Sequence, residues 1–578
     1  MAKKHHHPIP RGNDGMALIT ALIFIIISVI VLTSMTARYV QQQLQVDRFE
    51  DYYVCFDGAE AAVQLCSVSY ESGGTGIIGL DNWTPQFDES NRLVLPSFYD
   101  EAVTPMTLAT MPEVEFIGYT VSWFGNGRDM NGDGTPDSEA ERGMFTVYTA
   151  ARANGSERRL EVVYGTMDVN VWRNAIFAGN GQAGRLINGN VSIHGSVHLL
   201  GDDLPAGGLA INAIDLSGAS LISNNYAGMP ADLAQRIPPL PIREYEGEDM
   251  ATLNAVLRVK QGLVSMSGNS RIGLAHSPGS GVKNPMDAIF VNDGWTGNSV
   301  INDGGRGIPT RVWSDNGHEA LYDLGDRLSF PTLDSDWREP DGTRILNPHT
   351  GVWYTHEEYF TEVLLADPVI REDGIYEGNI TIHARNSPHY YWNATTEQEL
   401  TGAAALAATP NPTDDYIKYN ANTKVLTMNG QIRINGNLTF TGQGNEQTLH
   451  YSGRAAFLVD GNVDIDANLL TCNNGNPADT ANSFPVNNIM GIMTTQDMMV
   501  GASAQLSIMG AFYAEGTIQT RRQSNILGTF VANYFDMGTN VPSIYQVPPL
   551  ADNLPYGMIG NYPILIFQQR SWRELGIA

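Results

Sequence analysis

The strongest constraint on this chain is an apolar segment near its beginning, MALITALIFIIISVIVLTSM, which covers residues 16–35 without a charged side chain. Twenty residues of helix rise about 30 Å, which matches the hydrocarbon core of a bilayer. Residues 1–15 are short and basic, with Lys3, Lys4 and Arg11. Because basic flanks stay on the cytoplasmic side, the pattern predicts a single-pass membrane protein with its bulk outside the cytoplasm.

The helix is predicted to continue beyond the membrane, over residues 16–72. Apolar residues recur every three or four positions from 49 to 70, which indicates one stripe of an amphipathic helix. Gly73 and Gly74 follow, where a helix C-cap is expected. We therefore expect the second half of the helix to pack on a folded domain. The stripe consists of Phe49, Tyr52, Tyr53, Phe56, Ala59, Val63, Cys66 and Tyr70.

The leader 1–15, its final Gly15, the charge-free run and the continuing helix together resemble a type IV prepilin. GMALITALIFIII and FDGAEAAVQL (residues 56–65) are similar to the N-terminal region of PilX-type minor pilins. GMALITAL also resembles the K-type pseudopilin of type II secretion. The resemblance implies that prepilin peptidase cuts after Gly15, leaving Met16 as the new N-terminus. It also implies storage in the bacterial inner membrane, in contact with lipid, before the subunit joins other pilin or pseudopilin subunits in a surface filament.

Thr20 departs from the pattern of the major pilins. Those proteins carry a glutamate at the fifth mature residue, where it neutralises the N-terminal amine of a neighbouring subunit. Subunits of these families that lack the acid are placed at filament tips, so Thr20 implies a minor or tip-located subunit. Asn13 and Asp14 are a second departure, because a basic residue often stands just before the cleaved glycine. A plain signal anchor is the alternative interpretation of the segment.

Residues 73–172 are predicted to form a small antiparallel sheet that covers the amphipathic helix. Three alternating segments read as strands, at 114–124, 144–153 and 158–172. Asn154-Gly155 lies between the second and third and predicts a tight hairpin. A helix followed by an antiparallel meander resembles the pilin head.

The loop DMNGDGTPDSEAE, residues 129–141, is predicted to bind calcium. Calcium needs six to eight hard oxygen ligands, and alternating acidic and amide side chains around a glycine supply them. The twelfth position is Ala140 rather than an acid, so a neighbouring glutamate would have to close the site. The alternative is an acidic hairpin whose residues serve the turn. The candidate ligands are Asp129, Asn131, Asp133, the Thr135 carbonyl, Asp137 and Glu141.

Residues 173–578 are predicted to form a glycine-rich passenger of short strands, stacked as an irregular β-solenoid. Segments such as NGNVSIHGSVHL and DGNVDIDANLL alternate apolar residues between Gly, Asn and Asp. Insertions are expected near 228–262, which should include a helix, and near 313–370. GAFYAEGTIQ and GTFVANYF resemble the β-helical passenger that often follows a PilX-type N-terminus. The predicted fold class is thus mainly β, with one long N-terminal helix and an antiparallel sheet before the solenoid.

Composition argues against several other functions. Acids outnumber bases by 62 to 34, and the net charge of −28 disfavours a nucleic-acid partner.

The chain has three cysteines, Cys55, Cys66 and Cys472, and their spacing does not match that of a zinc site. Cys55 and Cys66 are separated by about 16 Å of helical rise, too far for a disulfide within one helix. Both are predicted to be small buried hydrophobes.

Few residues suggest catalysis. His356-Glu357 begins like a zinc-protease helix but lacks the second histidine. Asp464 and Asp466 alternate on a predicted strand, so they share a face, as paired acids of polysaccharide-cleaving enzymes do. A solvated outer face is the simpler interpretation. His194 and His198 lie two strand steps apart and are likewise predicted to be polar surface positions.

The sequence therefore predicts a non-enzymatic minor or tip-located type IV pilin-like subunit or pseudopilin, acting in filament assembly, adhesion or secretion. The alternative is a membrane-tethered β-helix protein that binds or cleaves carbohydrate. No motif identifies the ligand of the passenger.

Overall fold

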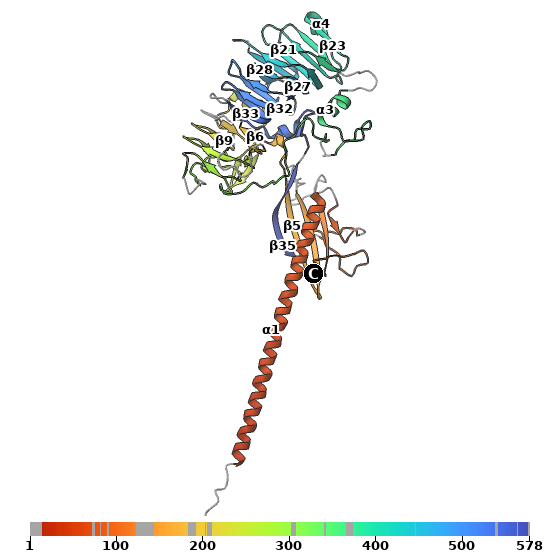
Figure 1. Cartoon of the computed structure of the whole chain (residues 1–578), viewed down its shortest axis with the longest axis vertical. Coiled ribbons are helices and arrows are strands. Elements are labelled where there is room, and N and C mark those ends of the chain that lie inside the picture. The colour runs from red at the N-terminus through yellow and green to blue at the C-terminus, as the bar shows by residue number, and fades with distance from the viewer. Residues whose placement is uncertain are drawn as a thin grey trace, which may run out of the picture. The chain divides into compact units, whose positions relative to one another are not determined.

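The computed structural model shows a mainly β protein with one long N-terminal helix, as the sequence predicts. The chain divides into two compact units (Figure 1). The first unit contains Met1–Met167 and Ile566–Ala578, and the second contains Asp168–Leu565. The structure describes all residues except 1–13, 72–74, 81–82, 89–91, 123–143, 183–191, 203, 205–210, 302–307, 340–342, 366–373, 445–446, 538–541, 563 and 576–578.

Helix α1 runs from Asp14 to Glu71, so the predicted long helix is confirmed. Gly73 and Gly74, the expected cap, lie outside the described residues. The predicted stripe is only partly correct. Ala59 and Cys66 are buried against the sheet, whereas Phe49 and Tyr53 are 64% and 61% exposed. A spacing of three and four residues drifts around a 3.6-residue helix, so the two ends of one apparent stripe face different directions.

An antiparallel sheet covers the C-terminal part of α1. Its centre is β3 (Met111–Ser122), β4 (Met144–Ala153) and β5 (Ser156–Asp168), which match the three predicted strands. The predicted hairpin is also present, with φ of 49° at Asn154 and 81° at Gly155. β1 (Ile77–Ile78) and β2 (Met106–Leu108) both pair with β3.

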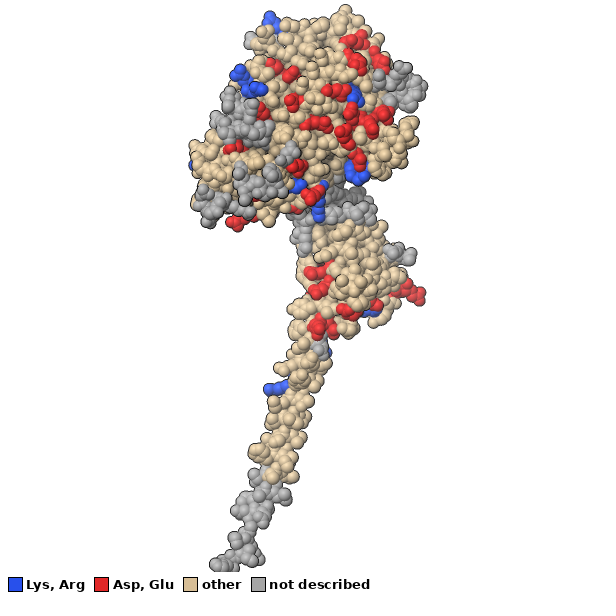
Figure 2. Space-filling view, viewed as in Figure 1, with Lys and Arg blue, Asp and Glu red and all other residues tan. Residues whose placement is uncertain are grey.

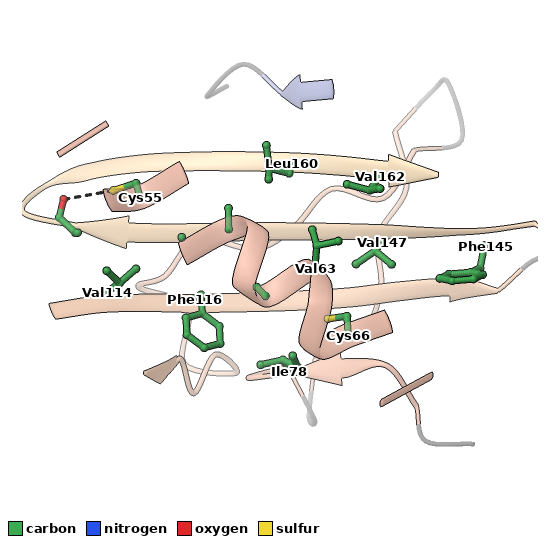
Figure 3. Close-up of a cluster of buried hydrophobic side chains, with 14 residues drawn as sticks. Cys55, Val63, Cys66, Ile78, Val114, Phe116, Phe145, Val147, Leu160 and Val162 are labelled. Atoms are coloured by element: carbon green, nitrogen blue, oxygen red, sulfur yellow. Dashed lines mark hydrogen bonds between the residues drawn. The ribbon is translucent and has the colours of Figure 1, made fainter. Parts of the chain in front are cut away.

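The core between helix and sheet is drawn in Figure 3. Its aromatic and aliphatic side chains point from the strands toward the small residues of α1. The labelled members are Cys55, Val63, Cys66, Ile78, Val114, Phe116, Phe145, Val147, Leu160 and Val162.

The last strand, β35 (Leu565–Leu575), pairs with β5 at the edge of this sheet. The predicted passenger, residues 173–578, is therefore wrong at its end. Residues 566–578 belong to the first unit, and the second unit is an insertion between two neighbouring strands of one sheet. The terminal segment alternates as any strand does, and its sequence gives no sign of a partner strand almost 400 residues earlier.

The second unit is a solenoid-like stack of parallel strands, built in two halves. The first half begins in the middle of the stack with β6 (Ile176–Gln182), and its later strands lie progressively nearer to one end. The second half begins at the opposite end of the stack, and its strands approach the middle until β33 (Asn525–Asp536) pairs with β6 in parallel. The strands of the first half are β6 (Ile176–Gln182), β8 (Val197–Leu199), β13 (Val256–Val259) and β16 (Ala288–Val291), flanked by β7 (Ser192–His194), β10 (Leu221–Ser223) and β15 (Arg271–Ile272). Those of the second half are β20 (Ile375–Glu377), β21 (Ile380–His383), β25 (Val425–Asn435), β26 (Leu438–Thr441), β27 (Thr448–Val459), β28 (Val463–Asp466), β29 (Asn468–Thr471), β30 (Ile489–Thr494), β31 (Met498–Val500), β32 (Ser507–Thr520), β33 (Asn525–Asp536) and β34 (Ser543–Tyr545).

A single column of buried side chains runs through both halves. Each member is the register partner of the next, so apolar residues meet directly across every parallel pair. Phe512 and Phe530 contact edge to face, with ring centroids 5.5 Å apart. Phe530 and Ile176, which meet at the junction between the halves, are as buried as the rest of the column. In stacking order the column is Ile432, Phe457, Ile492, Phe512, Phe530, Ile176, Val197, Leu257 and Ile289.

The recurring Gly-Asn pairs form a hydrogen-bonded ladder at one corner of the stack. The side-chain oxygen of Asn379 accepts from the backbone N–H of Asn437, at 2.8 Å. Asn437 does the same for Asn462 at 2.8 Å, and Asn462 for Asp497 at 3.3 Å. Each amide thus satisfies a backbone donor of the next coil at a turn, where the strand ladder is interrupted.

The two predicted insertions decorate the stack. Near 228–262 the only regular helix among the described residues is the single turn α2 (Ala231–Ala234), followed by the hairpin of β11 (Ile242–Tyr245) and β12 (Glu248–Ala251). Near 313–370 lie α3 (His356–Tyr359) and the π-helix η2 (Phe360–Leu364). The other elements are η1 (Val171–Arg173), β9 (Asn212–Leu216), β14 (Leu263–Met266), β17 (Trp295–Thr296), β18 (Val300–Ile301), β19 (Ile308–Pro309), β22 (Tyr390–Asn393), β23 (Gln398–Thr401), α4 (Gly402–Ala407), β24 (Tyr416–Asn420), η3 (Asn473–Gly475) and η4 (Pro548–Asn553).

Candidate functional site: the apolar stem

The N-terminal half of α1 is an apolar surface that the described residues of the first unit leave uncovered. We call residues 21–50 the stem. Every stem side chain that the structure describes is exposed. Within Ala21–Ser69 a window of 18 residues has a mean hydropathy of 2.2, and none of it is buried. Among the described residues, this is the one helix long and apolar enough to cross a membrane.

The stem side chains are large as well as exposed. Phe24, for example, is 72% exposed. In Figure 2 the stem is almost entirely tan, and acidic residues begin where α1 meets the sheet. A folded protein rarely leaves such a continuous apolar surface without a partner or a lipid phase to cover it. The large apolar residues are Leu22, Ile23, Phe24, Ile25, Ile26, Ile27, Val29, Ile30, Val31, Leu32, Met35, Tyr39, Val40, Leu44, Val46 and Phe49.

Small residues fix the opposite end of α1 on the sheet. Ala59 is fully buried, and its backbone carbonyl accepts a hydrogen bond from the Thr149 hydroxyl at 3.0 Å. A side chain at Gly58 would collide with Val114, and one at Gly118 would collide with the sulfur of Cys66. The helix therefore lies close enough to the strands to make a polar contact through its own backbone.

The C-terminal strand adds a second attachment for α1. Phe56 contacts the indole of Trp572, with ring centroids 5.5 Å apart. The hydroxyl of Tyr52 donates to Glu574 Oε2 at 2.9 Å, and the Arg158 guanidinium lies 4.4 Å from the Tyr52 ring centroid. Strand β35 thus contacts α1 close to the point where the helix leaves the sheet and the stem begins. Sequence reasoning missed this role of β35, because contacts between distant segments leave no local pattern.

The predicted processing residues lie at the start of the same helix. Gly15, Met16 and Thr20 are part of α1, and their side chains are outside the described residues. Their roles stay predictions.

The predicted calcium ligands lie outside the described part of the chain. Residues 123–143, which include Asp129, Asn131, Asp133, Thr135, Asp137 and Glu141, have no described placement. In the described remainder, no three His, Cys, Asp or Glu side chains are grouped so that they could hold a metal ion.

His194 and His198 are not surface residues, which corrects the prediction. Each is only 1% exposed. His194 Nδ1 lies 2.6 Å from the Asn225 carbonyl oxygen, and its ring stacks on Tyr545. His198 Nε2 lies 2.8 Å from the Tyr322 hydroxyl. Burial lowers the pKa of His194 to about 4 and that of His198 well below its usual value. Both are neutral core residues at neutral pH. Their strands alternate toward the interior of the solenoid, which a four-residue spacing did not reveal.

The remaining catalytic candidates are engaged in structural contacts. His356 is buried between the rings of Trp337 and Phe360, and burial lowers its pKa to about 3. Glu357 binds Arg433 at 2.6 Å.

Asp464 and Asp466 do alternate outward on one strand face, as predicted. Asp466 accepts hydrogen bonds from the backbone N–H of Ser503 at 3.0 Å and from its hydroxyl. Asp464 is exposed, and partial desolvation with the nearby Asp466 charge raises its pKa. Both carboxylates thus lie on the outer face of the strand, and Asp466 stabilises the turn that contains Ser503.

All three cysteines are free and buried, as predicted for Cys55 and Cys66. Cys55 Sγ points to the Ser156 carbonyl oxygen at 3.3 Å, and Cys472 lies in the solenoid core.

Comparisons with known proteins return little. No protein-family model matches the chain, and no curated protein sequence matches it either. Among solved structures, the competence-associated pilin ComZ from Thermus thermophilus is similar over 90% of this chain and 97% of its own, with a TM-score of 0.47 and 18% sequence identity.

Proposed function

We propose that this chain is a minor type IV pilin-like subunit of the PilX kind, which uses its stem to pass from the inner membrane into a filament. The observation that carries the proposal is the contrast along one helix. The C-terminal part of α1 is buried against a sheet, while the described side chains of the stem present a charge-poor apolar surface that is exposed along its length. Such a surface is stable in lipid or against other apolar helices, and in few other places.

The insertion of the second unit supports display as its role. Both crossings between the units occur at adjacent strands, β5 and β35, on the sheet that holds the stem. A large module inserted in this way interrupts the sheet only at one edge, and the pairing of the strands that hold α1 is kept. The proposed work of the subunit is therefore filament assembly, with adhesion or secretion served by the passenger, and it requires no catalysis by the chain.

The first test is the mature N-terminus in cells. We expect mass spectrometry to find a chain that begins at Met16, and we expect Gly15→Leu to retain the leader, because the peptidase is proposed to cut after this glycine. An intact leader on the natural chain would contradict the proposal.

The second test places a charge in the stem. Ile26→Asp should remove the subunit from purified filaments, because a carboxylate at the bilayer centre costs about 2.5–3.5 kcal/mol in membrane insertion and more in a dry helix bundle. Tyr99→Asp is the matched control, since Tyr99 is 85% exposed and is not part of the stem. Equal incorporation of both variants, or no co-purification of the natural chain with filament components, would refute a filament role.

The alternative of a carbohydrate-cleaving surface protein can be tested on the same material. Hydrolysis of glycans by the purified chain, abolished by Asp464→Ala, would favour that alternative. We expect no hydrolysis.

A further inference from the structure

A heptad pattern runs along the exposed side of α1 and continues beyond the part of the helix that lipid can cover. Apolar residues alternate at spacings of three and four over more than three heptads, which is the signature of a coiled-coil seam. The described members are between 56% and 69% exposed, with one polar exception, Gln42. In order, the a and d positions are Leu32, Met35, Tyr39, Gln42, Val46, Phe49 and Tyr53.

The seam faces away from the sheet of its own chain. At about 100° per residue, Val46 and Tyr53 point to the side of the helix opposite Cys55 and Ala62. Cys55 and Ala62 are fully buried on the sheet, while Tyr53, two residues earlier than Cys55, is 61% exposed. The described residues of the first unit therefore leave the seam exposed.

The bilayer covers only the first two positions of the seam, Leu32 and Met35. If residues 16–35 fill the hydrocarbon core, Tyr53 stands about 25 Å beyond it, at 1.5 Å of rise per residue. Tyr39 then lies near the headgroups, where tyrosine is enriched in membrane proteins. Val46, Phe49 and Tyr53 are left in water, where large apolar side chains are less stable than when they are buried.

We infer that residues 32–53 form a parallel two-stranded coiled coil with the same segment of a second copy of this chain. The inference rests on the proposed function for one point, that both copies are anchored at their N-termini in one membrane, which makes the helices parallel and brings the seams into register. Confinement in the membrane also raises the effective concentration of one seam for the other.

Size and charge are compatible with this pairing. Six large side chains that expose about 100 Å² each give about 1,200 Å² for the pair, the lower end of a specific interface. Across the parallel seam, Arg38 meets Gln43 and Gln45 meets Glu50, so no like charges oppose each other. Gln42 would pair with itself at a d position, where a buried amide specifies register.

The test is disulfide crosslinking of the full chain in native membranes. Val46→Cys and Phe49→Cys place a thiol in the seam, and Leu44→Cys is the control, because Leu44 is 53% exposed but lies on the far side of the helix. The three natural cysteines are buried, so the unsubstituted chain gives the background. We expect at least fivefold more homodimer from each seam variant than from Leu44→Cys, with the mass of two identical chains.

A second variant checks that the seam itself drives pairing. Phe49→Asp in a Val46→Cys background should abolish the crosslink without affecting the sheet, since Phe49 is exposed. Equal yields from seam and control positions, a crosslink to a different protein, or no loss with Phe49→Asp would overturn the inference. Leader removal, measured on the same samples, reports separately on the proposed function: processed chains without the dimer refute only the coiled coil, and dimers of unprocessed chains refute only the filament role.

Discussion

The indole Nε1 of Trp172 donates a hydrogen bond to the carbonyl oxygen of Ile559 at 2.7 Å, and so ties the first turn of the second unit to one of its last. Asn170 extends the tie by donating to the carbonyl oxygens of Gly560 and Tyr562, at 2.9 and 2.6 Å. The two ends of the inserted unit are thus fastened to each other by contacts internal to that unit. Termini held close together in this way are typical of domains that tolerate insertion into another domain.

The fragment 168–565 is therefore expected to fold by itself. It retains the complete buried column and both ends of the tie, so it should unfold cooperatively in guanidinium, with circular dichroism as the measurement. The fragment 173–578, whose bounds follow from the sequence alone, loses Trp172 and carries β35 without its partner β5. We expect it to be less stable and to aggregate through the unpaired strand. Equal solubility and midpoints for the two fragments would show that the tie and the placement of β35 do not matter.

Trp172→Phe in the fragment 168–565 tests the tie directly. The substitution keeps an aromatic ring but leaves the Ile559 carbonyl without its donor, so the free energy of unfolding should fall by about 1–3 kcal/mol. Trp353→Phe is the control, because Trp353 is 43% exposed and its loss should change the midpoint little. A midpoint shift no larger than that of the control would contradict the assignment.

The Gly-Asn corner makes a sharp steric prediction. At Gly461 a Cβ would collide with Asn437 Oδ1 and would lie 2.6 Å from the Gly436 carbonyl oxygen, which is backbone and cannot move aside. Gly461→Ala should therefore destabilise the unit by about 2 kcal/mol or more, as overpacking of a dense interior does. At Gly444 a Cβ meets open space, and only the φ of +59° opposes a side chain, so Gly444→Ala should cost about 1 kcal/mol. Denaturant midpoints that rank the variants in the opposite order would count against the ladder.

Local patterns in the sequence predicted local structure well. The long helix, the three strands of the small sheet and the Asn154-Gly155 hairpin follow from periodicity and turn chemistry, and all are present. The pairings that cross the chain could not be predicted in this way. Neither β35 on β5 nor β33 on β6 has a signal in its own residues, because any alternating strand can pair with any other. His194 and His198 were misplaced for a related reason: a spacing of four residues says nothing about the turn between them, which sends both rings inward.

The buried histidines give the second unit a pH-dependent stability. In an unfolded chain the pKa of an imidazole is near 6.5, and burial lowers the pKa of His194 to about 4. Between these values the unfolded state binds the extra proton, so stability is full above pH 6.5 and falls as the pH drops toward 4. For His194 alone the loss reaches about 3 kcal/mol at pH 4. We expect the free energy of unfolding of the fragment 168–565 to decrease steadily over this window.

His194→Gln should flatten that dependence, because glutamine does not titrate, although it lowers stability at pH 7 by disturbing the contacts to Asn225 and Tyr545. His349→Gln, the same substitution at an exposed position, is the control with which the slope of His194→Gln is compared. An unchanged slope in His194→Gln would mean that this ring is not protonated on unfolding.

Calcium binding at residues 129–141 can be tested although the loop lies outside the described residues. Addition of calcium to the detergent-solubilised full chain should raise the Tm of the first unit, since a ligand present at 100 times its Kd stabilises the folded state by about 2.7 kcal/mol. That corresponds to a shift of several degrees for a domain of this size. The double variant Asp129→Asn, Asp133→Asn removes two charged ligands and should abolish the shift, whereas Glu101→Gln, at an exposed position of the same unit, should preserve it. A Tm that chelator leaves unchanged would assign the acidic residues to the turn alone.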